Sequence, residues 1–292
     1  MMLQATLARA TAKFKLYWPL IKSLQTGLLL STGVAGYLSA HTHLSLAVFV
    51  GLIGSLFLAI SGSTTLNMWY DRDLDTVMNR THNRPLASGK VSQQEALWLG
   101  LMLSASGVTW AVAMNWLYGL VVFVGLFFDV IVYTIWLKRR TCWSIVWGGI
   151  SGGMPILSGR ILAVGRMDQI GVLLVLAILF WIPTHMLTFS IRYHDDYKKA
   201  GVPTFPSTYG EQFTRAMIAV SSVLAAVSIC WAGILIGVSA GYLRLMAVLT
   251  SGLLLLAFAT FRVQSEQVNF GLFKYASLYM LSAMTIFAAR AF

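Results

Sequence analysis

The chain alternates between long apolar blocks and short polar segments. A helix needs roughly 20 apolar residues to cross the hydrocarbon core of a bilayer. Nine blocks of about this length occur at positions 20–40, 44–66, 93–115, 117–137, 143–164, 170–191, 215–240, 242–261 and 270–289. None carries a polar stripe at helical spacing, which is typical of helices surrounded by lipid or by one another. The pattern predicts an all-α polytopic membrane protein with nine transmembrane helices.

Positive charge is distributed unequally between the two sides that these spans define. With the amino terminus in the cytoplasm, 17 of the 21 Lys and Arg residues fall in cytoplasmic segments. The positive-inside rule favours this orientation. Residues 1–19 are predicted to form a basic amphipathic cytoplasmic segment, and we find no removable signal peptide before the first block. We expect one membrane domain over residues 1–292.

Composition supports this assignment and removes several other classes of protein. The chain is 58% hydrophobic and 11% charged, far from the balance of a soluble domain. Its net charge of +11 follows from topology, and no basic loop is interleaved with aromatic residues as in a nucleic-acid-binding surface. Cys142 and Cys230 have no paired spacing, which argues against a disulfide.

The acidic residues are concentrated on the cytoplasmic side. Five of the ten fall in two short segments, one after the second block and one after the sixth: Asp71, Asp73, Asp75, Asp195 and Asp196. If the second helix continues beyond the membrane, Asn67, Asp71 and Asp75 share one face at four-residue intervals, and Asp73 points away. Three oxygen ligands on one face suit Mg²⁺, which takes one or two carboxylates together with substrate phosphate oxygens.

Both acidic segments also have a simpler interpretation. The alternative for the first is a solvated helix end that Arg72, Arg80 and Arg84 balance, which is less favoured than the metal-binding face; the second taken alone is explained equally by a mixed-charge loop between two spans. The bases Lys138 and Arg139 follow the fourth block, however, and would lie on the same side. Acids for a metal and bases for a phosphate together favour a site that stabilises a departing diphosphate.

A longer motif surrounds the first acidic segment: Asn67-x3-Asp71-x3-Asp75, followed by Arg80-Thr-x2-Arg84-Pro85-Leu86-x2-Gly89. It resembles the first motif of the UbiA superfamily of intramembrane prenyltransferases, and the residues at its variable positions are similar to those of the haem-farnesylating branch, the haem O synthases. Further matches within residues 20–210 are Gly33-Val-Ala-Gly-Tyr37, Tyr133-Thr-x2-Leu137-Lys138-Arg139, Gly152-Gly153-Met154-Pro155 and Asp196-Tyr197-x2-Ala200-Gly201-Val202-Pro203.

The chain departs from the superfamily pattern at three places. Lys22-Ser23-Leu24 stands where the family has Lys-Pro-Arg, and Pro183-Thr184-His185-Met186 where it has Pro-His-Phe. The second acidic segment lacks a complete Asp-x3-Asp, since Lys199 and Ala200 occupy the fourth positions after Asp195 and Asp196. A complete second motif would favour a quinone precursor as the acceptor, so the shortened form favours haem.

The resemblance implies a bundle around a central cavity that opens to the cytoplasm, and the brief amino-terminal tail favours a prokaryotic plasma membrane. The resemblance also implies transfer of a farnesyl group from farnesyl diphosphate to haem B, with haem B as a substrate and not a cofactor. Its other partners are membrane lipid and haem A synthase. The implied catalytic residues are Asp71, Asp75, Lys138 and Asp196, and the implied Mg²⁺ ligands are Asn67, Asp71, Asp75 and Asp196. The implied substrate-binding residues are Asn67, Arg80, Arg84, Tyr133, Arg139, His185, Arg192, Asp195, Tyr197 and Lys198.

Among the ionisable residues inside predicted spans, His185 and Asp129 are candidates for a functional role. His185 is an axial ligand candidate for haem iron, although a core histidine hydrogen-bonded to a neighbouring helix is an equal alternative. Asp129 indicates function because intramembrane ionisable groups usually have one, and its alternative is a buried pair or a cap on a polar cavity. An ion-coupled transporter using Asp129 is the third functional class considered, but such sites usually lie near the midplane within an inverted repeat, and no repeat is evident.

Overall fold

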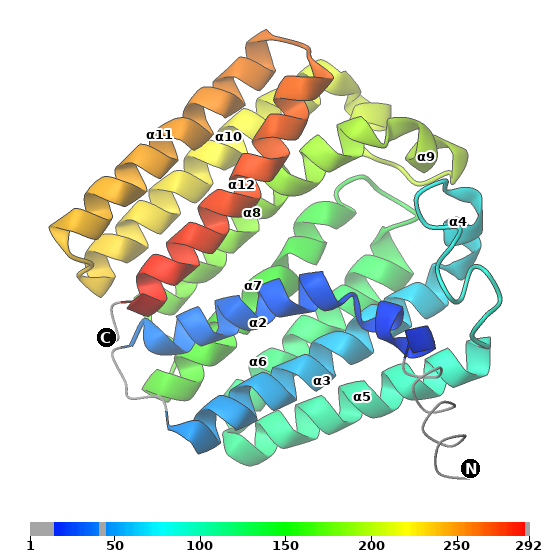
Figure 1. The fold of residues 1–292 in the computed structure, drawn as a ribbon, viewed down its shortest axis with the longest axis horizontal. Helices are drawn as coiled ribbons and strands as arrows, with labels where there is room; N and C mark the ends of the chain where they lie inside the picture. Colours follow the sequence, from blue (N-terminus) through cyan, green and yellow to red (C-terminus); the bar gives the residue numbers. More distant parts are fainter. Residues whose placement is uncertain (1–14, 41–44, 290–292) are drawn as a thin grey trace, which may run out of the picture.

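The computed structural model describes residues 15–40 and 45–289, and within these ranges the chain is helical with no β-strand (Figure 1). The elements are the 3₁₀-helix η1 (Trp18–Ile21), the π-helix η2 (Phe128–Leu137), and α2 (Ser23–Leu38), α3 (Leu46–Tyr70), α4 (Arg72–Val77), α5 (Gln93–Met114), α6 (Trp116–Phe127), α7 (Ser144–Val164), α8 (Gln169–Arg192), α9 (His194–Lys199), α10 (Phe205–Ile236), α11 (Ala240–Arg262) and α12 (Glu266–Ala289). Most of the predicted amino-terminal segment lies outside the described residues.

Among the described residues, seven helical segments are long and apolar enough to cross a membrane. They are α3, α5, α6 with η2, α8, α10, α11 and α12. The predicted blocks 20–40 and 143–164 correspond to α2 and α7, which do not meet that measure. Helix α2 has only 16 residues, and α7 contains many Gly and Ser residues together with Arg160. The all-helical class is confirmed, whereas the predicted number of nine spans is not.

Helix α10 begins earlier than the hydropathy pattern predicts. It starts at Phe205 because Thr204 and Ser207 form a capping box at its first turn. Gly210, with φ of 81°, interrupts its first part. Arg215, the first residue of the predicted block 215–240, therefore lies well inside the helix, where it is 3% exposed and pairs with Glu211 at 3.1 Å.

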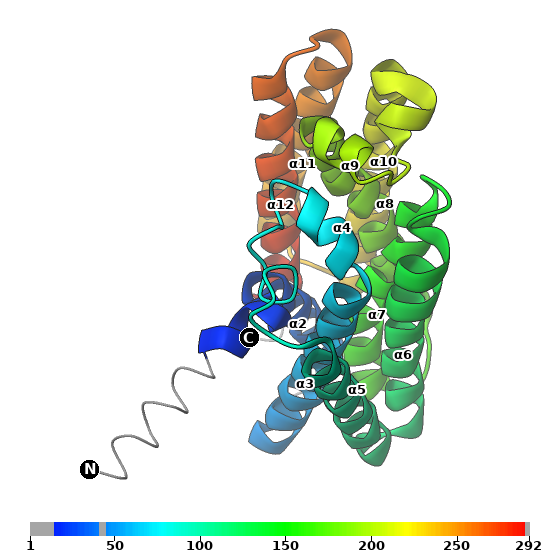
Figure 2. The same cartoon turned by 90° about the vertical axis from the view of Figure 1, so that its right-hand side faces the viewer.

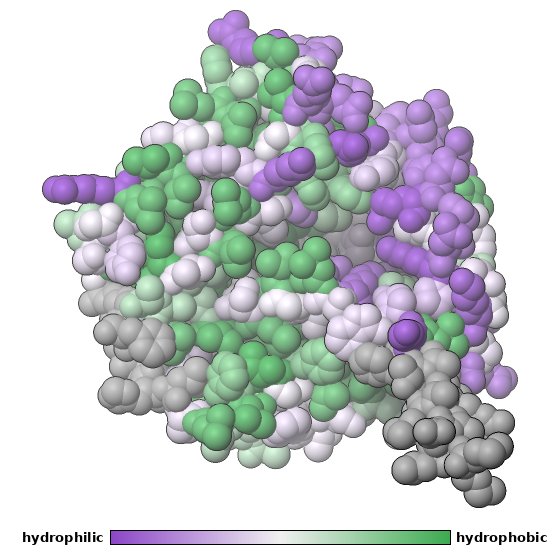
Figure 3. Space-filling model, in the orientation of Figure 1, coloured by the Kyte–Doolittle hydropathy of each residue, from purple (hydrophilic) through white to green (hydrophobic). Residues whose placement is uncertain are grey.

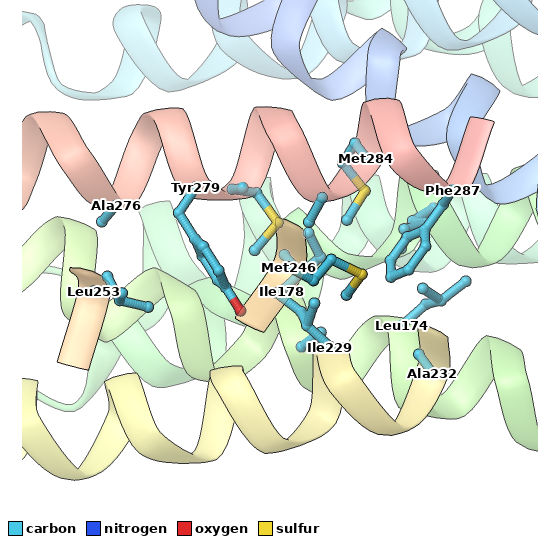
Figure 4. Close-up of a cluster of buried hydrophobic side chains, with 14 of the residues drawn as sticks. Leu174, Ile178, Ile229, Ala232, Met246, Leu253, Ala276, Tyr279, Met284 and Phe287 are labelled. Carbon is cyan, nitrogen blue, oxygen red and sulfur yellow. The ribbon is translucent and has the colours of Figure 1, made fainter. Parts of the chain in front are cut away.

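Two groups of helices pack around separate apolar cores. Side chains of α8, α10, α11 and α12 fill the larger core, seen in Figure 4, and a second core lies among α2, α3, α6 and α7. The helices α2 and α7 approach closely at glycines, since a Cβ on Gly36 would overlap the carbonyl oxygen of Ile156 and one on Gly159 that of Gly33. The Gly33-Val-Ala-Gly-Tyr37 motif is thus a packing surface.

The polar residues gather at one edge of the bundle. The short helices α4 and α9 lie side by side there (Figure 2), and the backbone NH of Arg80, just after α4, donates to Asp196 in α9 at 3.2 Å. Figure 3 shows this edge as a hydrophilic area, with a largely apolar surface over the helices beside it. The edge brings together the two acidic segments, which are far apart in the sequence.

Candidate active site

The first acidic segment lies where α3 passes into α4. Helix α3 ends at Tyr70, but the backbone continues to turn, because the NH of Asp71 donates to Asn67 O and the NH of Asp75 to Asp71 O, both at 2.9 Å. Asn67, Asp71 and Asp75 are 7%, 1% and 4% exposed, whereas the Asp73 side chain is 60% exposed. The four-residue spacing therefore places three oxygen-bearing side chains on the buried side.

Asp71 is held by a lysine from another part of the chain. The Lys138 Nζ donates to Asp71 Oδ2. Among the described residues, Asp71 Oδ1 is buried without a hydrogen-bond partner, and Arg139 Nη2 lies 3.9 Å from it. Burial alone would lower the pKa of Lys138, but the Tyr133 hydroxyl and the Asp71 carboxylate outweigh it and raise that pKa above its usual value. Lys138 is therefore a permanent cation at neutral pH.

The π-helix η2 sets the position of Lys138. Its last turn has the wide π spacing, since the Lys138 NH donates to Tyr133 O, five residues earlier, at 2.8 Å. Within η2 the Thr134 hydroxyl donates to Asp129 O at 2.7 Å, and it accepts from Asn67 Nδ2 at 2.8 Å. Such π-helical segments are frequent at functional sites. The network connects η2 directly to α3.

Lys22 is a site residue that sequence reasoning missed. Its Nζ lies 3.5 Å from Asn67 Oδ1, which fixes the amide with its oxygen toward this cation and its nitrogen toward Thr134. Lys22 adopts left-handed backbone angles, φ 45° and ψ 59°, between η1 and α2. The one available signal was the Lys-Pro-Arg position of the family motif, where this chain keeps only the lysine.

The remaining carboxylates of the first segment also have cationic partners. Arg84 Nη1 contacts both oxygens of Asp75 at 2.9 Å. Arg139, predicted to bind substrate, forms a two-pronged pair with Asp73 at 2.7 Å for each bond. These hydrogen bonds from Arg139 hold the pKa of Asp73 below its usual value. Each acid of the segment is therefore neutralised by a different base.

The second acidic segment is arranged differently. Asp196 is 7% exposed and accepts the backbone NH of Arg80, whereas Asp195 and Lys198 are exposed. Tyr197 lines a small cavity together with Tyr133 and Lys138. The segment thus contacts the first one through backbone, and no ion pair to its two aspartates occurs in the described residues.

The donor set at the end of α3 fits a magnesium ion. Within residues 15–40 and 45–289, no three His, Cys, Asp or Glu side chains converge. The donor atoms are the amide oxygen of Asn67 and the buried carboxylates of Asp71 and Asp75, and Asp71 Oδ1 has no hydrogen-bond partner among the described residues. Mg²⁺ uses one or two carboxylates when phosphate oxygens complete its shell. Asp196, bound to backbone, stands apart from this set.

Arg80 and Arg192 border an open cleft of about 380 Å³ that the second acidic segment also lines. The Arg80 guanidinium lies 4.9 Å from the centre of the Phe189 ring, and that of Arg192 lies 3.9 Å from the Phe270 ring. Both arginines belong to the predicted substrate-binding set. Their stacking on aromatic rings leaves the guanidinium edges available for an anion.

The two intramembrane candidates have defined surroundings. The imidazole of His185 stacks between Trp181 at 4.8 Å and Phe273 at 4.2 Å, and its Nδ1 lies 3.2 Å from Ser277 Oγ. Asp129 accepts a hydrogen bond from Ser63 Oγ. His185 thus has one ring nitrogen without a hydrogen bond in the described structure, while Asp129 serves the network around Asn67.

Acids and bases gathered at one edge of a bundle of long apolar helices are the arrangement expected of a membrane protein with a polar site. The model of the UbiA prenyltransferase family matches residues 28–280. A relative from Pyrobaculum islandicum, named protoheme IX farnesyltransferase, is 34% identical over 89% of this chain and 94% of its own length. One of the same name from Archaeoglobus fulgidus is 35% identical over 94% and 95%.

Solved structures show the same fold. A digeranylgeranylglyceryl phosphate synthase structure aligns with a TM-score of 0.80 at 19% identity, over 96% of this chain and 99% of the other. A UbiA homologue from Archaeoglobus fulgidus bound to DMAPP and Mg²⁺ aligns with a TM-score of 0.71 at 16% identity, over 93% and 99%. The chain belongs to the UbiA prenyltransferase family. It is an intramembrane prenyltransferase with several membrane-crossing helices.

Proposed function

We propose that this prenyltransferase transfers a farnesyl group from farnesyl diphosphate to a vinyl group of haem B, giving haem O. The observation that carries the proposal is the buried pair of Asp71 with Lys138, flanked by Asn67 and Asp75, at the polar edge of an apolar bundle. This set suits a lipid-soluble diphosphate. The names of the relatives from Pyrobaculum islandicum and Archaeoglobus fulgidus support haem as acceptor and farnesyl as donor.

The chain's own cations stabilise the leaving group. The side chains of Lys138 and Arg84 lie beside the carboxylates and stabilise the negative charge that develops on diphosphate as the allylic C–O bond breaks. A magnesium ion at Asn67, Asp71 and Asp75 supplies further charge neutralisation when bound. The apolar helices around the site exclude bulk water, which protects the farnesyl cation from hydrolysis.

The acceptor haem then reacts with the farnesyl cation. The π electrons of a vinyl group form the new C–C bond, one water molecule adds to the resulting carbocation, and a proton is released. The balance is haem B, farnesyl diphosphate and water giving haem O and diphosphate. His185 is the proposed axial ligand, because its Nε2 has no hydrogen bond in the described structure and its ring is clamped between Trp181 and Phe273.

The finer topology is part of the same proposal. We place α2 and α7 in the membrane with the seven segments above, which gives nine helices around a central cavity open to the cytoplasm, in a single domain over residues 1–292. The amino terminus is cytoplasmic and the membrane a prokaryotic plasma membrane. Haem A synthase is the proposed downstream partner.

The decisive experiment offers two acceptors to one purified protein. Detergent-solubilised protein with Mg²⁺ and farnesyl diphosphate is incubated with haem B or with 4-hydroxybenzoate, and products are identified by mass. The haem product alone supports the proposal, and prenylation of the benzoate alone refutes haem as acceptor. Asp71→Ala and Asp75→Ala should each abolish turnover. Asp73→Ala, at the exposed position between them, should retain most of it, and equal losses in all three would contradict the assignment.

His185→Ala tests the acceptor half separately. We expect weaker haem binding and an altered haem absorption spectrum, with farnesyl diphosphate binding unchanged, because His185 lies about two turns inside the membrane from the second acidic segment. An unchanged haem spectrum would remove His185 as the ligand.

A further inference from the structure

A row of aromatic rings lies along the interface of α8 and α12. From the inner end, Trp181 stacks on His185 at 4.8 Å and His185 on Phe273 at 4.2 Å. Phe273 then contacts Phe189 at 5.8 Å and Phe270 at 5.7 Å. The final ring, tilted against Phe189 with a centroid distance of 4.5 Å, is Tyr193. We call these residues the aromatic row. Helices α8 and α12 are antiparallel neighbours, so the end of α8 and the start of α12 lie together, and the row runs toward the polar edge there (Figure 1).

Three cations cap the outer end of the aromatic row. Arg192 lies 3.9 Å from the Phe270 ring centre, and Lys274 lies 4.6 Å from the same ring. Arg80, from the loop after α4, lies 4.9 Å from Phe189. We call Arg80, Arg192 and Lys274 the cation cluster. It draws side chains from three separate segments to one end of the row.

The cation cluster is not neutralised within the protein. All ten acidic residues lie in the described ranges, and the one ion pair to the cluster is Arg192 with Glu266 at 3.5 Å, whose side chain is 70% exposed. Asp196 contacts only the backbone of Arg80. An exposed pair at that distance contributes about 0–1 kcal/mol. Three cations over aromatic rings with one weak partner indicate a site for an anion.

The ligand chemistry follows from this combination. An inorganic anion needs cations but no row of rings, and an isoprenoid chain needs apolar surface but no cations at its end. A flat aromatic dicarboxylate uses both. Arg192 is seven residues beyond His185 on α8, a separation of about 10 Å along the axis, on the order of the reach from the centre of a porphyrin to its propionate carboxylates.

We propose that the cation cluster binds the propionate carboxylates of a porphyrin while the aromatic row borders its ring. The inference rests on the proposed function and deepens it, because it assigns the acceptor a binding edge separate from the diphosphate site. Arg80 and Arg192 of this cluster also line the open cleft of about 380 Å³, together with Asp195 and Asp196 of the second acidic segment. Bidentate guanidinium contacts to carboxylates are well suited to such an anchor.

The test compares protoporphyrin IX with its dimethyl ester, using fluorescence to measure binding to the full chain in detergent. Metal-free porphyrin removes any contribution from axial ligation. Wild type should bind the free acid at least tenfold more tightly than the ester. The Arg192→Gln/Lys274→Gln double variant should lose that preference, keeping its ester affinity. Both residues are exposed, so the variant is expected to fold. Arg262→Gln, which removes a similar stack on Phe258 at 5.3 Å in α11, is the matched control and should behave as wild type.

The outcomes separate this inference from the proposed function. Equal affinity of wild type for acid and ester, or an unchanged preference in the double variant, overturns the carboxylate anchor. So does a loss of farnesyl diphosphate binding in the double variant with no loss of porphyrin preference, which would assign the cluster to the diphosphate. If the preference behaves as expected but no prenylated haem forms, the anchor stands and the proposed reaction fails.

Discussion

Replacement of Lys138 by Met separates the structural and catalytic roles of the Asp71–Lys138 pair. Met keeps the length of the stem and removes the charge. The Asp71 side chain is 2% exposed and that of Lys138 18%, so the variant leaves a carboxylate in a dry environment with Arg139 Nη2 at 3.9 Å. Breaking a buried pair costs about 3–5 kcal/mol. Because Arg139 remains nearby, we expect the lower end, about 3 kcal/mol.

Activity should fall for a different reason. Lys138 pairs with Asp71, one of the carboxylates proposed to bind Mg²⁺, and loss of one donor to a developing anion lowers kcat by about 10²–10³. The double variant Lys138→Met/Asp71→Asn removes the orphaned charge and replaces it with a neutral amide of the same shape. We expect it to recover most of the lost stability while its activity stays lost.

The assay measures two quantities on each variant. Denaturant unfolding in detergent gives the free energy of unfolding, and turnover of farnesyl diphosphate at saturating haem gives kcat. Lys90→Met, at an exposed position, is the matched control and should change neither. Recovery of activity in the double variant, or a kcat within threefold of wild type in Lys138→Met, would refute the role given to this lysine.

Three further predictions concern packing, acid stability and metal. Gly36→Ala should destabilise the protein by about 1–3 kcal/mol, since its Cβ would overlap Ile156 O. Gly27→Ala, with open space around it, should not destabilise the protein. Equal effects of the two variants in thermal unfolding would contradict the close approach of α2 and α7. Hydrogen bonds from Arg160 lower the pKa of Asp168, so their stabilisation is present above about pH 4 and is lost as the pH falls through the folded-state pKa. Asp168→Asn should therefore reduce the loss of unfolding free energy at acid pH. An unchanged pH dependence of stability would exclude a contribution from this pair. Removing Mg²⁺ should weaken binding of farnesyl diphosphate, and the diphosphate should raise Mg²⁺ affinity by the same factor; titrations showing independent binding would contradict a shared site.

The sequence predicted the helices well where hydropathy alone determines them. Blocks such as 242–261 and 270–289 correspond closely to α11 and α12. Blocks 20–40 and 143–164 also correspond to helices, α2 and α7, but these two do not meet the measure of a membrane span; they pack by close backbone contact, at Gly36 and Gly159 for example. The prediction failed at the start of α10, where a capping box outside the apolar block begins the helix.

The same distinction between local and long-range interactions applies to the residues of the candidate site. Asn67, Asp71 and Asp75 were found because helical spacing is a local property of one segment. Thr134 and Lys22 were not found, because their roles arise from contacts between elements distant in the sequence. The π-helical register of η2, which sets the position of Lys138, has no hydrophobic period that distinguishes it from an α-helix at this length.

The charge pattern explains why the two acidic segments have different roles. Asp71, Asp73 and Asp75 are each paired with a separate base, whereas Asp196 is bound through backbone. The cations Lys138 and Arg84 therefore have two competing partners, the buried carboxylates and an incoming diphosphate. As a diphosphate attracts these bases, the carboxylates lose their counter-charge, and a divalent cation held by Asn67, Asp71 and Asp75 would restore it. In the proposed reaction the same two bases thus neutralise the carboxylates before the substrate binds and then stabilise the leaving group, which accounts for the burial of two aspartates at the edge of a membrane.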